Sequence, residues 1–189
     1  METGQYLDRT LAKYAGTFDI YRNYSINGKK YPVYGYFFSD SEKYVLSKKA
    51  NMWTIHEYEH ILFIEVKEIT KDLLDELYGV MESYMEPVLV RKNNKYPEKD
   101  HMSSFLTAAI ICEKHPSPEI EKLIRKFRFD KGYLFSFRGH SEGHIICADM
   151  ETESVITNYE ARKMKKFYKQ TFDEVKSGKI GYAEAYETK

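Results

Sequence analysis

Two histidine pairs, His56 with His60 and His140 with His144, are the side chains in this sequence whose spacing best suits chemistry. Three residues separate the histidines of each pair. The second histidine is followed in both cases by Ile, an aliphatic residue, two mostly apolar residues and an acid. Aromatic-rich residues precede both stretches. The two stretches therefore read as copies of one pattern, which predicts an internal duplication.

A helix through the first pair would make it a zinc site. His56 and His60 would then lie on one helical face, and Glu57 between them would complete the HExxH pattern of zinc hydrolases, with Glu57 as general base. The flanking Ile, Val and aromatic residues favour strands instead. The charged Glu59 is unlike the apolar helix of such enzymes, and the second copy lacks the glutamate. We therefore rank the zinc hydrolase below a strand interpretation.

A hairpin is the preferred interpretation of each pair. Three-residue hairpin loops favour glycine at the left-handed position, which Gly143 supplies. His140 and His144 would then be cross-strand neighbours with Cβ atoms about 5 Å apart, as would His56 and His60. Such pairs can bind a metal, but most of them stack at a partly wet end of a sheet. Zn²⁺ at these four histidines is therefore kept only as an alternative.

Glu65 and Lys67 carry a second enzymatic hypothesis. Helix, three strands, helix, strand is the core of the PD-(D/E)xK nuclease fold, and the predicted order of elements resembles it. The E-x-K motif of that family also ends an apolar strand. Asp40 would supply the upstream acid, and two carboxylates would hold Mg²⁺ to activate water. Charged residues make up 31% of the chain, however, so a solvated ion pair is the commoner origin of such a pattern.

Composition limits the classes of partner. The chain has 189 residues, which predicts one domain over residues 1 to 176 with a flexible tail over 177 to 189. Lys plus Arg equals Asp plus Glu at 29 each, so net charge indicates neither nucleic acid nor an anionic membrane as partner. Cys112 and Cys147 lie in apolar runs and are expected to be core residues in a reducing cytoplasm. No secretion signal or membrane-spanning run is visible, so we expect a cytoplasmic protein.

The 17 tyrosines and 11 phenylalanines favour strands. We therefore expect one α+β domain with a largely antiparallel, aromatic-rich sheet, helices packed on one of its faces, and pseudo-repeats over about 31 to 85 and 102 to 176. Helices are predicted at 5 to 15, from Thr70, at 118 to 127 and from Thr157 to about 176. Strands are predicted at 31 to 38, 43 to 47, 51 to 56, 60 to 67, 105 to 112, 132 to 139, 144 to 150 and 153 to 157.

Three segments resemble a small prokaryotic family without assigned function, a domain of unknown function. They are residues 133 to 139 (YLFSFRG), 96 to 102 (YPEKDHM) and 155 to 158 (VITN). The resemblance implies a cytoplasmic single-domain protein and offers no catalytic residue. Because tyrosine is enriched at interfaces, the leading functional prediction is a non-catalytic binding, adaptor or regulatory domain that needs no cofactor. Its expected partner is another protein or a second copy in a homodimer.

Overall fold

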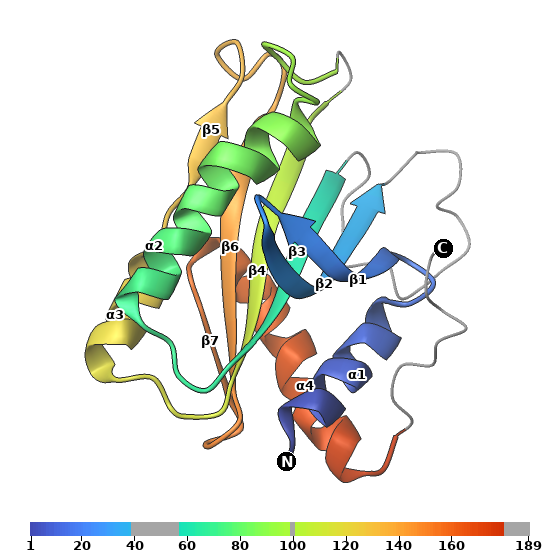
Figure 1. Ribbon diagram of the computed structural model, residues 1–189, viewed down its shortest axis with the longest axis vertical. Helices are drawn as coiled ribbons and strands as arrows, with labels where there is room; N and C mark the ends of the chain where they lie inside the picture. The colour runs from blue at the N-terminus through green and yellow to red at the C-terminus, as the bar shows by residue number, and fades with distance from the viewer. Residues whose placement is uncertain (39–56, 99–100, 180–189) are drawn as a thin grey trace.

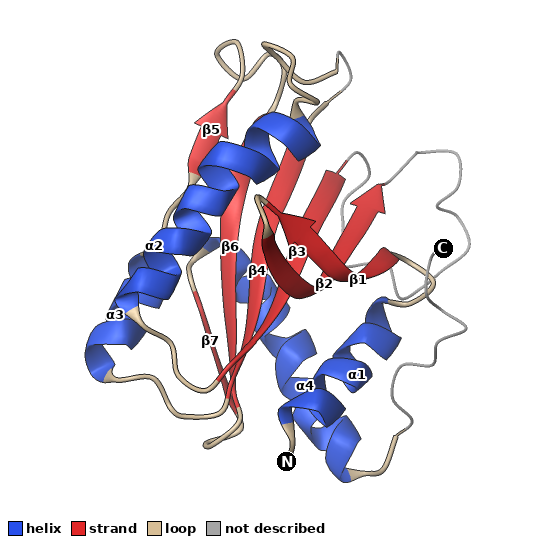
Figure 2. Ribbon diagram, viewed as in Figure 1, coloured by secondary structure: helices blue, strands red, loops and turns tan. Residues whose placement is uncertain are grey.

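The chain forms one α+β fold in which helices cover both faces of a mixed seven-stranded sheet (Figures 1 and 2). A computed structural model describes residues 1–38, 57–98 and 101–179. The helices are α1 (Thr3–Tyr14), α2 (Lys71–Val80), the π-helix η2 (Met81–Val90), α3 (Pro118–Lys126), the 3-10 helix η3 (Glu160–Met164) and α4 (Lys165–Lys176). The strands are β1 (Asp19–Ile26), β2 (Lys29–Phe38), β3 (Glu57–Val66), β4 (Ser103–Cys112), β5 (Asp130–Gly132), β6 (His140–Asp149) and β7 (Ser154–Thr157).

The centre of the sheet is parallel and its margins are antiparallel. The strand order is β1-β2-β3-β4-β6-β5, with β7 also paired to β6. β4 lies parallel to β3 on one side and to β6 on the other, and the remaining pairs are antiparallel. Parallel neighbours need a crossover, which α2 with η2 provides between β3 and β4. The predicted antiparallel character thus holds for most pairs but not for the core.

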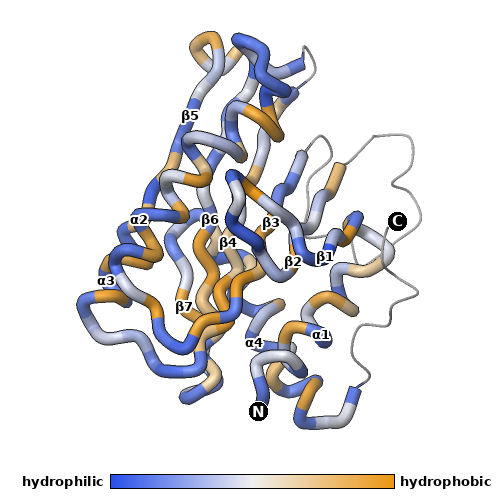
Figure 3. Tube along the Cα trace, viewed as in Figure 1, coloured by the Kyte–Doolittle hydropathy of each residue, from blue (hydrophilic) through white to orange (hydrophobic). Residues whose placement is uncertain are grey.

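Helices pack on both faces, so the prediction of a single covered face is wrong. α2, η2 and α3 cover one face through residues such as Leu77, and α1 and α4 cover the other through residues such as Tyr168. β3, β4 and β6 are consequently buried on both sides, which explains their nearly continuous apolar runs (Figure 3). Cys112 and Cys147 are buried free thiols of this core, as expected. In the described part of the chain, no helix combines the length and apolarity needed to cross a membrane.

Two helix starts predicted from capping residues are confirmed. Thr70 accepts a hydrogen bond from the Leu73 backbone N–H, and Ser117 accepts one from that of Ile120. The last helix ends at Lys176 as predicted, but its predicted start at Thr157 is wrong, because helical structure begins with a 3-10 turn at Glu160.

The first hairpin was missed. β1 and β2 are joined by Asn27 and Gly28, whose φ angles of 50° and 83° are those of a type I′ turn. Asn-Gly is the strongest short hairpin signal, so the sequence did contain it. The predicted strands at 43 to 47 and 51 to 56 lie outside the described residues.

The strand predicted at 132 to 139 is also wrong. β5 ends at Gly132, and Leu134, Phe135 and Ser136 all have positive φ angles, which end a strand. Aromatic content indicated a strand here, but the backbone turns.

The two copies of the histidine pattern form interior strands on either side of β4, not hairpins. Both hairpin predictions are wrong, because β3 and β6 run without a break through the expected loops. The counterpart of His140 in the first copy is His56, but the residue level with His140 across β4 is Glu57. The two copies are therefore offset by one residue. A one-residue offset reverses the side-chain direction, and His60 and His144 therefore face opposite sides of the sheet. The duplication itself stays a prediction.

Candidate functional site

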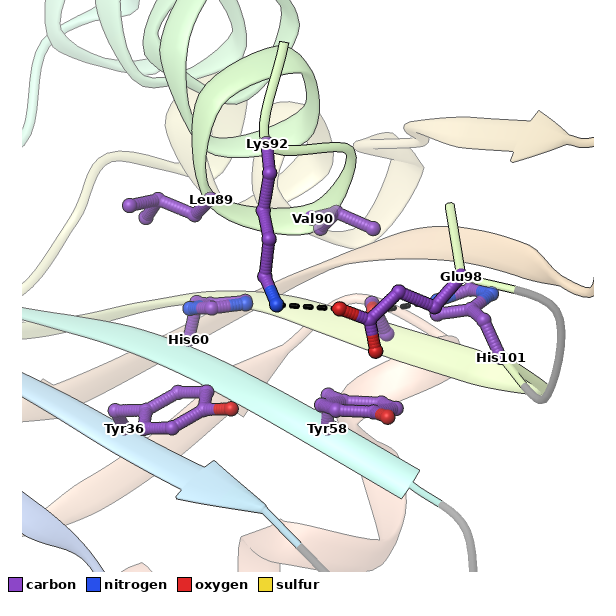
Figure 4. Close-up of a pocket in the computed structure, with 9 residues that line it drawn as sticks. Tyr36, Tyr58, His60, Leu89, Val90, Lys92, Glu98 and His101 are labelled. Atoms are coloured by element: carbon purple, nitrogen blue, oxygen red, sulfur yellow. Dashed lines mark hydrogen bonds and ion pairs between the residues drawn. The ribbon is translucent and has the colours of Figure 1, made fainter. Parts of the chain in front are cut away.

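A groove lined by tyrosines lies between the face of β1, β2 and β3 and the end of η2. It consists of two adjoining hollows of about 410 Å³ and about 30 Å³, and Tyr36, His60, Leu89 and Lys92 line both. We call it the tyrosine groove. The larger hollow adds Tyr21, Tyr24, Tyr34 and Val88, and the smaller, shown in Figure 4, adds Tyr58, Val90, Glu98, His101 and Ser104.

Strand geometry gathers these rings on one face. Tyr34 and Tyr36 are two residues apart on β2, and Tyr36 pairs with His60 on β3. Tyr21 and Tyr24 are three residues apart, which normally places side chains on opposite faces. Asn23 between them has a φ of 54°, and this left-handed residue breaks the alternation so that both tyrosines line the groove.

The rings are close to parallel. Tyr24 and Tyr34 have centroids 4.3 Å apart with planes 24° apart, and Tyr36 and His60 are 5.1 Å and 27° apart. Tyr21, Tyr24 and Tyr36 are only partly buried, so ring surface remains accessible in the groove for a further planar group.

His60 contributes a neutral imidazole. Burial, reinforced by nearby His101, lowers its pKa to about 3, so it is uncharged near neutral pH. Its Nδ1 lies 2.7 Å from the Tyr34 hydroxyl. Its Nε2 makes no hydrogen bond with any described residue, and both hollows contact the ring (Figure 4). The groove therefore offers one neutral nitrogen for a ligand.

His101 is held in a single tautomer at the far end. Its Nδ1 lies 2.9 Å from the Arg138 carbonyl oxygen, so Nδ1 donates, and Nε2 accepts from the Ser104 hydroxyl at 2.8 Å. A serine bonded to an oriented histidine is the arrangement of an activated nucleophile. Ser104 is fully buried, however, and the Tyr58 ring stacks on His101 with ring centroids 5.7 Å apart.

Lys92 and Glu98 lie over the smaller hollow. Figure 4 shows Lys92 extending from the end of η2 to Glu98, and the two charged groups are 2.5 Å apart. Both side chains are about two-thirds exposed, so the pair contributes under about 1 kcal/mol and can open.

A buried carboxylate fixes η2 above the groove. Glu86 is fully buried and accepts hydrogen bonds from Arg91 Nε at 2.6 Å, Lys131 Nζ at 3.0 Å and the Tyr133 hydroxyl at 2.9 Å. Burial alone raises the pKa of Glu86, but these donors outweigh it and lower the pKa. Pro87 follows within the helix and has no N–H to donate, which fits the wide π-type turn. A lone acid within the apolar residues 85 to 90 was the signal that sequence reasoning overlooked.

The residues of the nuclease hypothesis are not assembled into a site. Glu65 near the end of β3 and Lys67 just beyond it are exposed, and neither side chain forms a hydrogen bond or ion pair with a described residue. Asp40 lies outside the described residues. Phe38, the last described residue of β2, pairs with Tyr58 at the opposite end of β3 from Glu65.

The four histidines are likewise kept apart. His56 lies outside the described residues, and Glu57 begins a strand rather than continuing the helix that the HExxH interpretation requires. His140 and His144 share one strand with Cα atoms about 13 Å apart.

The second histidine pair has its own neighbours. On the face opposite the tyrosine groove, His144 Nε2 lies 3.0 Å from a Glu142 oxygen, and its ring stacks on Phe105 at 4.9 Å. Across the described ranges, no three His, Cys, Asp or Glu side chains are grouped so as to hold a metal.

Comparison with known families agrees with the resemblance noted in the sequence. Residues 2–170 match a domain of unknown function (DUF8052), and the chain belongs to that family. Neither the curated proteins nor the solved structures contain a significant match to it.

Proposed function

We propose that this family member is a non-catalytic binding domain whose tyrosine groove holds a planar aromatic group. The observation that carries the proposal is the set of nearly parallel rings on the face of β1, β2 and β3, bordered by a hollow of about 410 Å³. Aromatic pairs gain about 0.5 to 1.5 kcal/mol beyond the burial of their area, so a ring inserted here is stabilised by several neighbours at once.

The polar groups narrow the class of ligand. His60 Nε2 is neutral and can hydrogen-bond a ring substituent without an electrostatic cost. Lys92 borders both hollows and is paired with Glu98, so the charged side chains at the groove carry no net charge. The preferred group is therefore a neutral aromatic ring, from a small molecule or from a side chain of a protein partner.

Saturation-transfer NMR tests the proposal with phenol, indole and adenine as probes. We expect saturable binding of at least one probe to the wild-type chain and loss of that binding in Leu89→Arg, which places a charged side chain in both hollows. Tyr159→Ser is the matched control, because Tyr159 is an exposed aromatic residue that does not line the groove. Absence of binding by all three probes, or binding that Leu89→Arg leaves intact, would contradict the proposal.

A further inference from the structure

A short loop displays two phenylalanines to solvent at one end of the molecule. We call residues 133 to 139, between β5 and β6, the aromatic loop (Figure 1). Phe135 is 97% exposed and Phe137 85%, and Met102 beside the loop is 60% exposed. Side chains of this size are normally covered, and contiguous exposed apolar groups mark interaction sites. Because both phenylalanines are exposed, the loop does not occupy the tyrosine groove of its own chain.

The backbone of the aromatic loop has an energetically unfavourable conformation. Leu134, Phe135 and Ser136 have φ angles of 52°, 55° and 67°, a left-handed run that costs roughly 1 to 2 kcal/mol per residue. Strain of this kind persists where the surroundings enforce it and concentrates at functional positions.

Both ends of the aromatic loop are anchored. Tyr133 N–H donates to the Gly139 carbonyl at 3.0 Å, and Arg138 Nη1 donates to the Pro97 carbonyl at 3.0 Å. A Cβ on Gly139 would lie 2.0 Å from the Met102 carbonyl oxygen, so only glycine closes the loop here. The aromatic loop therefore has a defined conformation and projects from the molecule.

We infer that the partner of the tyrosine groove is the aromatic loop of a second copy of this chain, so that two copies dock reciprocally. This inference rests on the proposed function, and it names the aromatic group as the Phe135 and Phe137 side chains. One chain carries both a projecting pair of aromatic rings and an open hollow walled by stacked rings. A twofold arrangement lets each copy give one loop and receive one, which closes the assembly at a dimer.

Charge and area are compatible with self-association. The formal net charge is zero, so two copies do not repel each other at long range. Two phenylalanines bury about 300 to 500 Å² when fully covered. That is a large part of the roughly 800 Å² that each partner contributes to a standard interface.

Sedimentation-velocity ultracentrifugation across micromolar concentrations tests the inference. We expect a wild-type dimer, and at least tenfold weaker association for the loop variant F135S/F137S and for the groove variant Leu89→Arg. The phenylalanines are exposed in the monomer, so the loop variant should melt like the wild type at concentrations at which the wild type is monomeric. If Leu89→Arg melts early, Tyr21→Ala replaces it as the groove variant. Tyr159→Ser, which alters an exposed aromatic residue outside the loop, should dimerise normally.

Mixing the two variants gives the decisive result. The loop variant keeps an intact groove and the groove variant keeps an intact loop, so a mixed pair restores one of the two contacts that a pair of identical variants lacks. The mixture should therefore associate more tightly than either variant alone and more weakly than the wild type. A wild-type-like dimer of F135S/F137S, or a mixture that associates no more tightly than the single variants, would overturn the inference.

The NMR probes separate this inference from the proposed function. A wild-type monomer at the highest concentration whose groove still binds an aromatic probe would overturn the reciprocal dimer and leave the binding domain standing. A monomer that binds no probe would overturn both.

Discussion

His60 is a histidine whose side chain stays unprotonated in the folded protein over most of the accessible pH range. Its ordinary pKa of 6.5 falls to about 3 on burial. Between these pH values His60 is protonated in the unfolded chain but not in the folded chain. The free energy of unfolding should therefore fall as the pH decreases through this window, by up to about 1.4 kcal/mol per pH unit for one proton.

Replacing His60 should remove this pH dependence. We expect urea unfolding of His60→Gln to give a flatter plot of unfolding free energy against pH than the wild type between pH 6.5 and about 3. Carboxylates titrate in both proteins, so the difference between the two plots isolates His60. Parallel plots would show that His60 is protonated equally in the folded and unfolded chains.

Glu86 illustrates the cost of removing one member of a buried charge network. Glu86→Gln leaves Arg91 and Lys131 facing a neutral amide, and because both cations are partly solvated we expect a loss of about 1 to 3 kcal/mol in unfolding free energy. Chemical denaturation measures the loss. Adding Lys131→Met should recover part of it, because one stranded cation is then gone. Equal stability of Glu86→Gln and wild type would mean that the carboxylate is not needed to hold η2.

At the scale of elements, the decisive feature is that β3 and β6 flank β4 and are buried on both faces. Ile64 on β3 and Ala148 on β6 are 7% and 1% exposed, and they face opposite layers of helices. Both side chains are packed among apolar residues of the two layers, so a charge at either position would lie in an apolar environment.

Ile64→Asp and Ala148→Asp should each unfold the protein at room temperature, because each buries an unpaired carboxylate. Circular dichroism and thermal melting would detect the loss of structure. Glu65→Ala, next to Ile64 but exposed, is the matched control and should change the unfolding free energy by no more than about 0.5 kcal/mol. A folded Ala148→Asp protein would show that α1 and α4 do not exclude water from their face of the sheet.

At the scale of the molecule, the parallel centre of the sheet lies between two apolar cores, one under each layer of helices. The backbone amides of β3, β4 and β6 pair with strands on both sides and should exchange with deuterium only on global unfolding. The aromatic loop and the short exposed β5 should exchange much faster. Hydrogen-exchange mass spectrometry checks this order. Exchange in β6 as fast as in β5 would place the stable core elsewhere.

Several features followed from the sequence alone because their causes are local. Continuous apolar runs indicated the buried strands β3, β4 and β6, the hydroxyl side chains of Thr70 and Ser117 indicated where two helices begin, and the apolar neighbours of Cys112 and Cys147 indicated that both are core residues. Tyrosine content did not indicate where the tyrosine rings gather.

Only the tertiary structure decided how those elements and side chains meet. The one-residue offset between β3 and β6 sends His60 and His144 to opposite faces, and no count along the chain reveals an offset that is set by pairing to β4. Glu86 becomes a support of the groove because Lys131 and Tyr133 approach it from a distant segment. The tyrosine groove likewise draws on β1, β2, β3 and η2, whose closeness depends on packing across the sheet rather than on spacing in sequence.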